Sequence, residues 1–360
     1  MPATRDLHEL GQSLWLDNIT REILDDGTLQ RYIDDLSVTG LTSNPSIFQK
    51  AIGGSDRYDD QIRELLGQGL DTEPLFFELA IRDLQRAADL FKPIHEATGG
   101  VDGWVSLEVS PLLANDTENT IAQAKELHAR AGRENLYIKV PGTREGLPAI
   151  EELIFAGVPI NVTLLFSREH YLAAAEAYTR GVERRVEAGL DPFVCSVASL
   201  FISRWDKGTA DVLQGDLRNA AGIAIGERTY KSFHEFINGD RWTELKEHGA
   251  KPQRLLMAST GTKDPALPDT LYVTALAAPE TVNTMPEKTL LAFADHGSVD
   301  GAMPTDGGDC EAVLAGITGA GVDLEALAEQ LQVEGRDSFD AAWHAMIADI
   351  AAKAEAVARG

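Results

Sequence analysis

The chain has 360 residues, 44% of them hydrophobic and 25% charged, a composition typical of a soluble globular protein that buries a core without disulfides. Its 57 acidic side chains outnumber the 32 basic ones, and the resulting formal charge of −25 would repel nucleic acids and anionic membranes. With two cysteines and no apolar run of about 18 residues, the sequence predicts no disulfide framework, structural zinc site or membrane span.

Short apolar runs alternate with longer amphipathic segments along the chain. Segments such as residues 74–91 carry apolar residues at spacings of three and four, which is typical of helices. Strands alternating with such helices predict parallel βαβ units, and eight strands favour a (β/α)8 barrel over an open sheet. The predicted strands are residues 13–19, 37–43, 103–109, 135–141, 158–165, 192–199, 254–259 and 271–276.

The segments that connect these strands differ in length. Residues 44–102 and 200–253 are each long enough for more than one helix, whereas TGTKDPALPDT, before the eighth predicted strand, holds little more than one helical turn. After residue 297 the sequence becomes loop-like, and residues 323–358 predict two helices. We therefore predict a barrel domain over residues 1–297 and a C-terminal loop and helical extension over residues 298–360, packed on the barrel.

Polar side chains share one face of several predicted strands. Because side chains alternate along a strand, residues two apart point the same way. The fully apolar face of each strand suits the surrounding helices, so the polar face is expected to line the lumen, near the C-terminal strand ends where barrel enzymes place their chemistry. Several ionisable residues at matching depth are hard to explain by packing, because buried charges are costly unless paired. The lumen set is Asp17, Glu108, Lys139, Asn161 and Thr163.

Each candidate also has an ordinary structural explanation. Taken alone, Lys139 is explained better as an edge lysine that reaches solvent, and Glu108 as its ion-pair partner. Asp17 could accept backbone N–H bonds at a helix start, and Asn44 followed by proline has the pattern of a helix N-cap. Four further candidates fit strand ends, a helix surface or a solvated loop without any function: Thr163, Ser199, Arg204 and Lys263. Cys195 lies among valines and is expected to be a small buried hydrophobe.

From about residue 13 to residue 297 the chain resembles the transaldolase family, in its long bacterial form. WLDNI and SLEVSP belong to the ordered set of similar strings, which is far more specific than any one of them. The resemblance implies the barrel fold and a Schiff-base aldol mechanism without metal or other cofactor. The most specific strings are GLTSNPS (40–46), NLYIKVPGTREGLPAIEEL (135–153), INVTLLFS (160–167), LMASTGTKDP (256–265) and LYVTALAAPETVNTMP (271–286).

The same resemblance implies the reaction. A dihydroxyacetone unit would move from fructose 6-phosphate or sedoheptulose 7-phosphate to erythrose 4-phosphate or glyceraldehyde 3-phosphate, in the non-oxidative pentose phosphate pathway. Lys139 would form the Schiff base, and an apolar strand favours the neutral amine that this step needs. Asp17 would exchange the C4 hydroxyl proton, and Glu108, with a water held by Thr163, would shuttle protons.

Substrate-binding residues follow from the same comparison. Three side chains would hold the retained three-carbon fragment: Asn44, Asn161 and Ser199. Arg204 and Ser259 would bind the phosphate. Where some family members carry a second arginine, this chain has Gly261, and we interpret Lys263 as the replacement cation, although lysine offers no bidentate fork. These cations would supply the local positive charge that a phosphorylated substrate needs in an acidic protein.

Two other functions remain open. A related lyase would release free dihydroxyacetone without an acceptor, although the long C-terminal extension favours transfer. A non-catalytic barrel that binds sugar phosphates or a protein partner is disfavoured, because every chemical position holds a competent residue. The expected partners are sugar phosphates, with neither nucleic acid nor membrane, and the sequence leaves monomer and homodimer open. The N-terminus lacks the apolar core of a signal peptide and the cysteines suit a reducing compartment, so we expect the cytoplasm.

Overall fold

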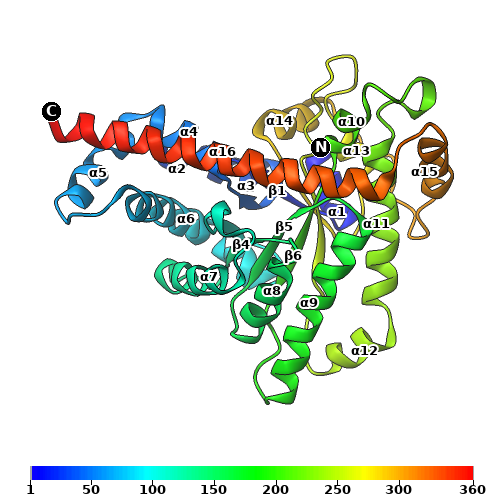
Figure 1. The fold of residues 1–360 in the computed structure, drawn as a ribbon, viewed down its shortest axis with the longest axis horizontal. Helices are drawn as coiled ribbons and strands as arrows, with labels where there is room; N and C mark the ends of the chain where they lie inside the picture. The colour runs from blue at the N-terminus through cyan, green and yellow to red at the C-terminus, as the bar shows by residue number, and fades with distance from the viewer. Residues whose placement is uncertain (1, 360) are drawn as a thin grey trace.

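Eight parallel strands surround a common axis in the computed structural model, which describes residues 2–359 (Figure 1). Their order is β2-β1-β8-β7-β6-β5-β4-β3. Between β2 and β3, the N–H of Leu41 donates to the carbonyl of Trp104 at 2.9 Å, and that of Gly103 donates to Thr39 at 3.0 Å. These bonds bring the two end strands together, which confirms the predicted (β/α)8 barrel. The strands are β1 (Ser13–Asp17), β2 (Val38–Thr42), β3 (Val105–Glu108), β4 (Leu136–Pro141), β5 (Ile160–Leu165), β6 (Ser196–Phe201), β7 (Arg254–Ala258) and β8 (Val282–Met285).

The prediction of an eighth strand at residues 271–276 is wrong. That run forms a short helix, α13 (Leu271–Ala275), and β8 begins at Val282. A short apolar run is equally compatible with a buried strand and with a buried helical turn. Here the run forms a helix, which buries Tyr272 and Val273. The sixth strand also begins later than predicted, at Ser196 instead of residue 192. The other predicted strands overlap observed ones.

Helices follow every strand and cover the outside of the barrel. Residues 44–102 and 200–253 each hold several helices, as predicted. The helices are α1 (Ala3–Leu10), α2 (Arg21–Asp25), α3 (Thr28–Leu36), α4 (Pro45–Gly53), α5 (Asp59–Leu66), α6 (Thr72–Ala97), α7 (Thr117–Ala131), α8 (Gly146–Phe155), α9 (Arg168–Glu187), α10 (Ser203–Thr209), α11 (Ala221–Ile237), α12 (Asp240–Glu247), α13, α14 (Glu287–His296), α15 (Cys310–Gly319) and α16 (Leu324–Arg359), with 3-10 turns η1 (Asp56–Tyr58), η2 (Pro111–Leu113) and η3 (Gly215–Leu217).

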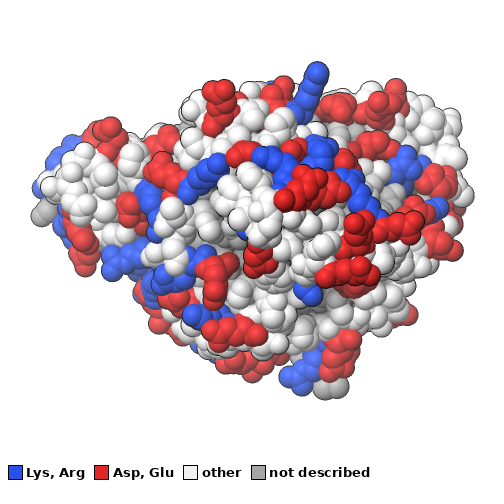
Figure 2. Space-filling view, turned by 90° about the horizontal axis from the view of Figure 1, so that it is seen from below, with Lys and Arg blue, Asp and Glu red and all other residues white. Residues whose placement is uncertain are grey.

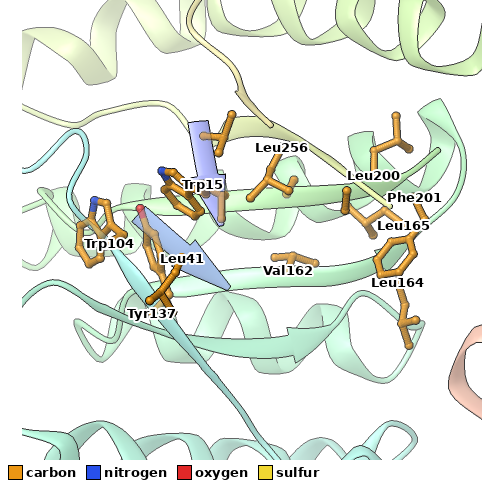
Figure 3. Packing of buried hydrophobic residues seen from close by; sticks show 14 of the residues in the cluster. Trp15, Leu41, Trp104, Tyr137, Val162, Leu164, Leu165, Leu200, Phe201 and Leu256 are labelled. Atoms are coloured by element: carbon orange, nitrogen blue, oxygen red, sulfur yellow. The ribbon is translucent and has the colours of Figure 1, made fainter. Parts of the chain in front are cut away.

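Aromatic side chains fill the barrel near the N-terminal ends of its strands. The rings of Trp104 and Tyr137 stack with centroids 3.9 Å apart, and Trp15 lies 6.1 Å from Tyr137 (Figure 3). Gly40 on β2 makes room for this layer, because a Cβ there would come within 2.7 Å of the Trp15 indole nitrogen. The aromatic layer fills the N-terminal end of the barrel. The polar residues near the C-terminal strand ends therefore face the opposite end.

The C-terminal extension differs from its prediction. One continuous helix, α16, spans Leu324–Arg359 where two helices were predicted, and α15 precedes it. Gly335 lies within this helix, where glycine is intrinsically unfavourable. The glycine is buried against the barrel, where a Cβ would lie 3.0 Å from Leu164 and 3.1 Å from the Arg204 guanidinium. Close packing therefore offsets the helix-breaking tendency.

Helix α16 crosses the molecule from α15 to α4 and passes the ends of β5 and β6 (Figure 1). Near its C-terminal end the Lys353 ammonium pairs with Asp59 at 3.0 Å. Trp343, in its middle, packs edge-on against Phe76 of α6 at 5.2 Å. The extension thus packs on the barrel along most of its length, while the domain boundary at residue 297 stays a prediction.

The surface carries mixed charge. Figure 2 shows basic side chains interspersed among acidic ones over one face of the molecule. Across residues 2–359, no helix combines the length and the apolarity that crossing a membrane requires. Cys195 is buried, and burial raises the pKa of its thiol to about 12, so it is a packed thiol and not a nucleophile, as predicted.

Candidate active site

A cavity of about 220 Å³ opens at the C-terminal ends of the strands. Eight of the ten predicted site residues line it, although they come from positions as far apart as β1 and the loop after β7. Glu108 and Asn161 do not line the cavity, but each contacts a residue that does. The eight are Asp17, Asn44, Lys139, Thr163, Ser199, Arg204, Ser259 and Lys263.

Lys139 lies at the inner end of this cavity, on β4. Its side chain is buried, and its Nζ donates to the carbonyl of Ser43 at 3.0 Å and contacts the Glu108 carboxylate at 3.4 Å. Glu108 comes from the neighbouring strand β3, where it is the register partner of Lys139. The amine is thus held by two acceptors, one just after β2 and one on β3, which contradicts the alternative of an edge lysine that reaches solvent.

Asp17 occupies the end of β1 on the same side of the barrel. The Thr42 hydroxyl lies 2.7 Å from one Asp17 carboxylate oxygen and 2.7 Å from the Thr284 hydroxyl. This chain of hydrogen bonds spans β1, β2 and β8 and fixes the carboxylate without using up both of its oxygens. The alternative that Asp17 accepts backbone N–H bonds at the start of the next helix is contradicted, since Thr20 caps α2 by accepting from Ile23.

Two carboxyl groups and one amine therefore share a poorly solvated space. Burial raises the pKa of Asp17, and the positive charge of Lys139 and the Thr42 hydrogen bond oppose this shift. Burial likewise raises the pKa of Glu108, again against the charge of Lys139. Burial thus shifts the pKa of both carboxyl groups toward neutral pH. A carboxyl whose pKa is near the working pH can both accept and donate protons.

Thr163 and Ser199 contribute hydroxyl groups to the cavity that Lys139 also lines. Within residues 2–359 the Thr163 hydroxyl is buried and has no hydrogen-bond partner, so it can hold a water or a substrate group. The Ser199 hydroxyl donates to the Asn161 side-chain oxygen at 2.7 Å, and the Asn161 nitrogen donates to Ser106 at 3.2 Å. Asn161 is fully buried and thus supports Ser199 from behind in this structure.

Asn44 serves as the N-cap of α4. Its side-chain oxygen accepts from the N–H of Ile47 at 3.1 Å, and Pro45 occupies the first helical position. The helix-cap prediction is confirmed, and Asn44 lines the cavity as well. Since the cap uses the oxygen, the amide nitrogen is left to donate to a ligand.

The other end of the cavity is positively charged. The Arg204 guanidinium lies 5.1 Å from the ring centroid of Phe201, 5.9 Å from Phe339 and 6.0 Å from Phe166. Burial lowers the pKa of Arg204, and no carboxylate of the described chain comes within ion-pair distance of it. Partial burial, followed by the charges of Arg204 and Lys207, lowers the pKa of Lys263. An anion would relieve this mutual repulsion.

The loop after β7 packs closely at Gly261, the position at which some family members carry an arginine. A Cβ at Gly261 would lie 3.2 Å from Pro286 and 3.3 Å from Thr289, so a larger residue would require the start of α14 to shift by a few tenths of an ångström. Ser259, two residues earlier, has a φ of 57° and meets the Ser203 hydroxyl at 2.9 Å. This turn brings both Ser259 and Lys263 to the cavity.

Sequence reasoning missed several residues of the site. Thr42 was within a similar string, and its position two residues before Asn44 was a usable signal. Ser43 contributes a backbone carbonyl, which no side-chain pattern reveals. Phe339 lines the cavity from α16, about 200 residues away along the chain from Lys139, and only the folded structure brings it there. Lys207 adds charge from α10, one helical turn after Arg204.

A larger cavity of about 420 Å³ lies at the opposite end of the barrel, around the starts of β1, β6 and β7. Arg254 lines it and donates to three backbone carbonyls and the Ser13 hydroxyl. This cavity is lined by Lys251, Asp102 and Glu280, and Lys139 and Asp17 do not line it. In the part of the chain described, no three His, Cys, Asp or Glu side chains form a group that could hold a metal ion.

A buried lysine between two carboxyls at the C-terminal mouth of a (β/α)8 barrel defines a lysine-centred barrel enzyme. The sequence pattern of the family described as Transaldolase/Fructose-6-phosphate aldolase matches residues 14–350. The chain belongs to this family.

Curated relatives agree over the full length. The chain is 45% identical over 351 residues to a transaldolase of Parafrankia sp. (strain EAN1pec), with 95% of each chain covered. It is 45% identical over 353 residues to a transaldolase of Renibacterium salmoninarum, covering 96% of this chain and 94% of the relative. A transaldolase of Mycobacterium ulcerans is 44% identical over 370 residues, with 99% of each chain covered.

Proposed function

We propose that this chain is a transaldolase, which transfers a dihydroxyacetone unit from a ketose phosphate to an aldose phosphate through a Schiff base on Lys139. The observation that carries the proposal is the buried amine of Lys139, within 3.4 Å of Glu108 and on a cavity that Asp17 also lines. The names of full-length relatives support the same activity. The proposed residue roles are those that the family resemblance implies, and the positions of these residues around the cavity support them.

The first half of the proposed reaction forms the Schiff base. The neutral amine of Lys139 attacks the C2 carbonyl of the donor, and the carbinolamine then loses water to give an iminium. Glu108 is placed to take a proton from the attacking nitrogen and to return it to the leaving hydroxyl. A water held by the unpartnered Thr163 hydroxyl would link Glu108 to that oxygen.

The second half breaks the C3–C4 bond. Asp17 removes the C4 hydroxyl proton, the C4 carbon leaves as an aldehyde, and the bond electrons move into the iminium to give an enamine. The acceptor aldehyde then reacts with the enamine by the reverse steps, with Asp17 returning its proton. Asn44 and Ser199 line the same cavity and would hold the hydroxyl groups of the retained fragment, with Asn161 supporting Ser199.

Arg204, Lys263 and Ser259 would bind the substrate phosphate. We expect Lys263→Ala to raise the KM for fructose 6-phosphate about tenfold and to change kcat less than about threefold, because losing one charge-assisted contact weakens ground and transition states alike. Lys263→Arg should keep most of the affinity, since the charge stays. Steady-state kinetics with each sugar phosphate measure both parameters.

The matched control for this prediction is Lys92→Ala. Lys92 is exposed on α6 and pairs with Glu96 at 3.7 Å, away from the cavity, so its loss changes the net charge equally. A KM in Lys263→Ala that equals that of Lys92→Ala would contradict the role of Lys263. A uniform rise in both variants would indicate that long-range charge, and not a local contact, is responsible.

Acceptor dependence tests the proposed function. Fructose 6-phosphate is supplied with and without erythrose 4-phosphate, and glyceraldehyde 3-phosphate, sedoheptulose 7-phosphate and free dihydroxyacetone are measured. We expect steady turnover only with the acceptor. Sustained release of dihydroxyacetone without acceptor would identify a lyase, the second activity in the family description. A cytoplasmic location and the oligomeric state stay predictions.

A further inference from the structure

Helix α16 presents one face to the mouth of the barrel. Gln332, Gly335 and Phe339 follow one another at spacings of three and four residues, so they lie on the same side of the helix. Gly335 is buried against Leu164 and the Arg204 guanidinium, and Phe339 lines the cavity. Gln332 lies one turn before Gly335 and contacts the backbone of Leu164 on β5 and of Gly142, the residue that follows β4.

The backbone of β5 is irregular at the active site. Val162 pairs with Ala198 and Leu165 pairs with Leu200, so two residues of β5, Thr163 and Leu164, oppose one residue of β6. Leu164 has a φ of 62°, in the left-handed region that a leucine rarely adopts. Such a bulge redirects the side chain beside it, and here that side chain is Thr163.

Gln332 spans this bulge. Its side-chain amide has two N–H groups; one donates to the carbonyl of Leu164 at 2.9 Å and the other to the carbonyl of Gly142 at 3.2 Å. Gly142 follows β4, the strand that carries Lys139, and its own N–H donates to the carbonyl of Thr163 at 2.7 Å. The Gln332 amide therefore links β5, which carries Thr163, to the residue that follows β4, the strand that carries Lys139.

We propose that Gln332 is a positioning residue of the active site, which holds the strained Leu164 bulge so that the Thr163 hydroxyl stays aligned with Lys139. This inference rests on the proposed function. The C-terminal extension then has a catalytic purpose beyond covering the barrel, because a residue on α16 sets the geometry of a proton-transfer step. Thr163 needs such support, since its hydroxyl has no partner of its own in the described chain.

If Gln332 positions Thr163, its loss should slow the step that depends on Thr163. Thr163 is assigned to carbinolamine formation and dehydration, whereas C3–C4 cleavage depends on Asp17. We expect Gln332→Met, which keeps the side-chain length and removes both donors, to slow adduct formation about tenfold, in line with the cost of a small misplacement of a catalytic group. Carbon–carbon cleavage from the preformed adduct, and the KM for fructose 6-phosphate, should change less than about twofold.

The experiment is a single turnover with fructose 6-phosphate, in which borohydride quenching and protein mass follow the adduct and glyceraldehyde 3-phosphate release follows cleavage. Gln332→Glu is the second variant. Its carboxylate repels both carbonyls, whereas the protonated acid can donate one hydrogen bond. The ratio of its adduct rate to that of the unaltered protein should therefore increase as the pH falls from 8 toward 5.

Gln330→Met is the matched control. Gln330 is exposed on the same helix, and its amide donates to Glu334 at 2.7 Å. A lower thermal midpoint with an unchanged adduct rate in Gln332→Met would refute the inference and leave the proposed function intact. If Gln332→Met does not fold, a pH-independent ratio for Gln332→Glu refutes it instead. Failure of the unaltered protein to form any adduct would refute the proposed function itself.

Discussion

Lys139→Met is expected to abolish turnover, with a loss of at least about 10⁴-fold, and to remove the borohydride-stable adduct with fructose 6-phosphate. Methionine fills a similar volume but has no nucleophile, so no Schiff base can form. The substitution leaves Glu108 buried without its ion-pair partner, and because burial already raises the pKa of this carboxyl, it can become neutral instead of remaining as an unpaired charge. We therefore expect the variant to fold.

Trapping provides an internal control for this prediction. Lys263 lines the same cavity but lies at its exposed rim, so it is a competing amine within reach of the donor sugar. In the unaltered protein, peptide mass analysis should locate the reduced adduct on Lys139, and omission of the sugar should abolish it. An adduct on Lys263 with Lys139 unmodified, in an enzyme that still turns over, would refute the assignment of the covalent centre.

Most of the barrel follows from local sequence pattern. Strands such as β4 and β5 are apolar on one face and bounded by turn residues, and this pattern depends little on the rest of the chain. The eighth strand did not follow, because its four residues, VNTM, are half polar and the neighbouring run LYVTA is the better strand by propensity. Two helices were predicted where α16 is continuous, and the close packing of Gly335 against the barrel is a tertiary effect that local pattern does not reveal.

Alternation along the strands predicted much of the candidate site. It placed Lys139, Glu108 and Asp17 on one lumen face, and the structure brings the three together. It could not foresee contributions that depend on distant segments, such as Phe339 from the last helix. Alternation also did not predict that Asn161, although on the lumen face, is fully buried and bonded to Ser199 and Ser106 and does not line the cavity.

The net charge can be read from the sequence, but the local positive charge at the cavity depends on the fold. The net charge of −25 comes from composition, and it argued against nucleic acids and anionic membranes as partners without locating a site. The positive end of the cavity arises because α10 brings Arg204 and Lys207 toward Lys263, and folding leaves Arg204 between aromatic rings and not beside a carboxylate. An acidic protein can thus bind an anionic sugar through one local exception to its overall charge.

Asp17→Asn is expected to slow carbon–carbon cleavage by about 10²-fold to 10⁴-fold while adduct formation changes only a few-fold. Asparagine has nearly the same shape, and its amide oxygen can still accept from Thr42, so the hydrogen-bond chain to Thr284 is kept. The amide cannot take the C4 hydroxyl proton. The variant should therefore accumulate the donor adduct, which borohydride traps in near-stoichiometric amount, while glyceraldehyde 3-phosphate release almost stops.

The pH dependence of the cleavage step gives a second readout. Burial raises the pKa of the Asp17 carboxyl, so the carboxylate that acts as base is lost as the pH falls through this raised value. Cleavage in the unaltered enzyme should rise with pH along this limb, and the limb should vanish in Asp17→Asn. Asp34→Asn, an equal charge change at an exposed position on α3, should behave like the unaltered enzyme. Equal loss of trapping and cleavage in Asp17→Asn would mean that Asp17 acts before the bond breaks, and its role as the C4 base would have to be abandoned.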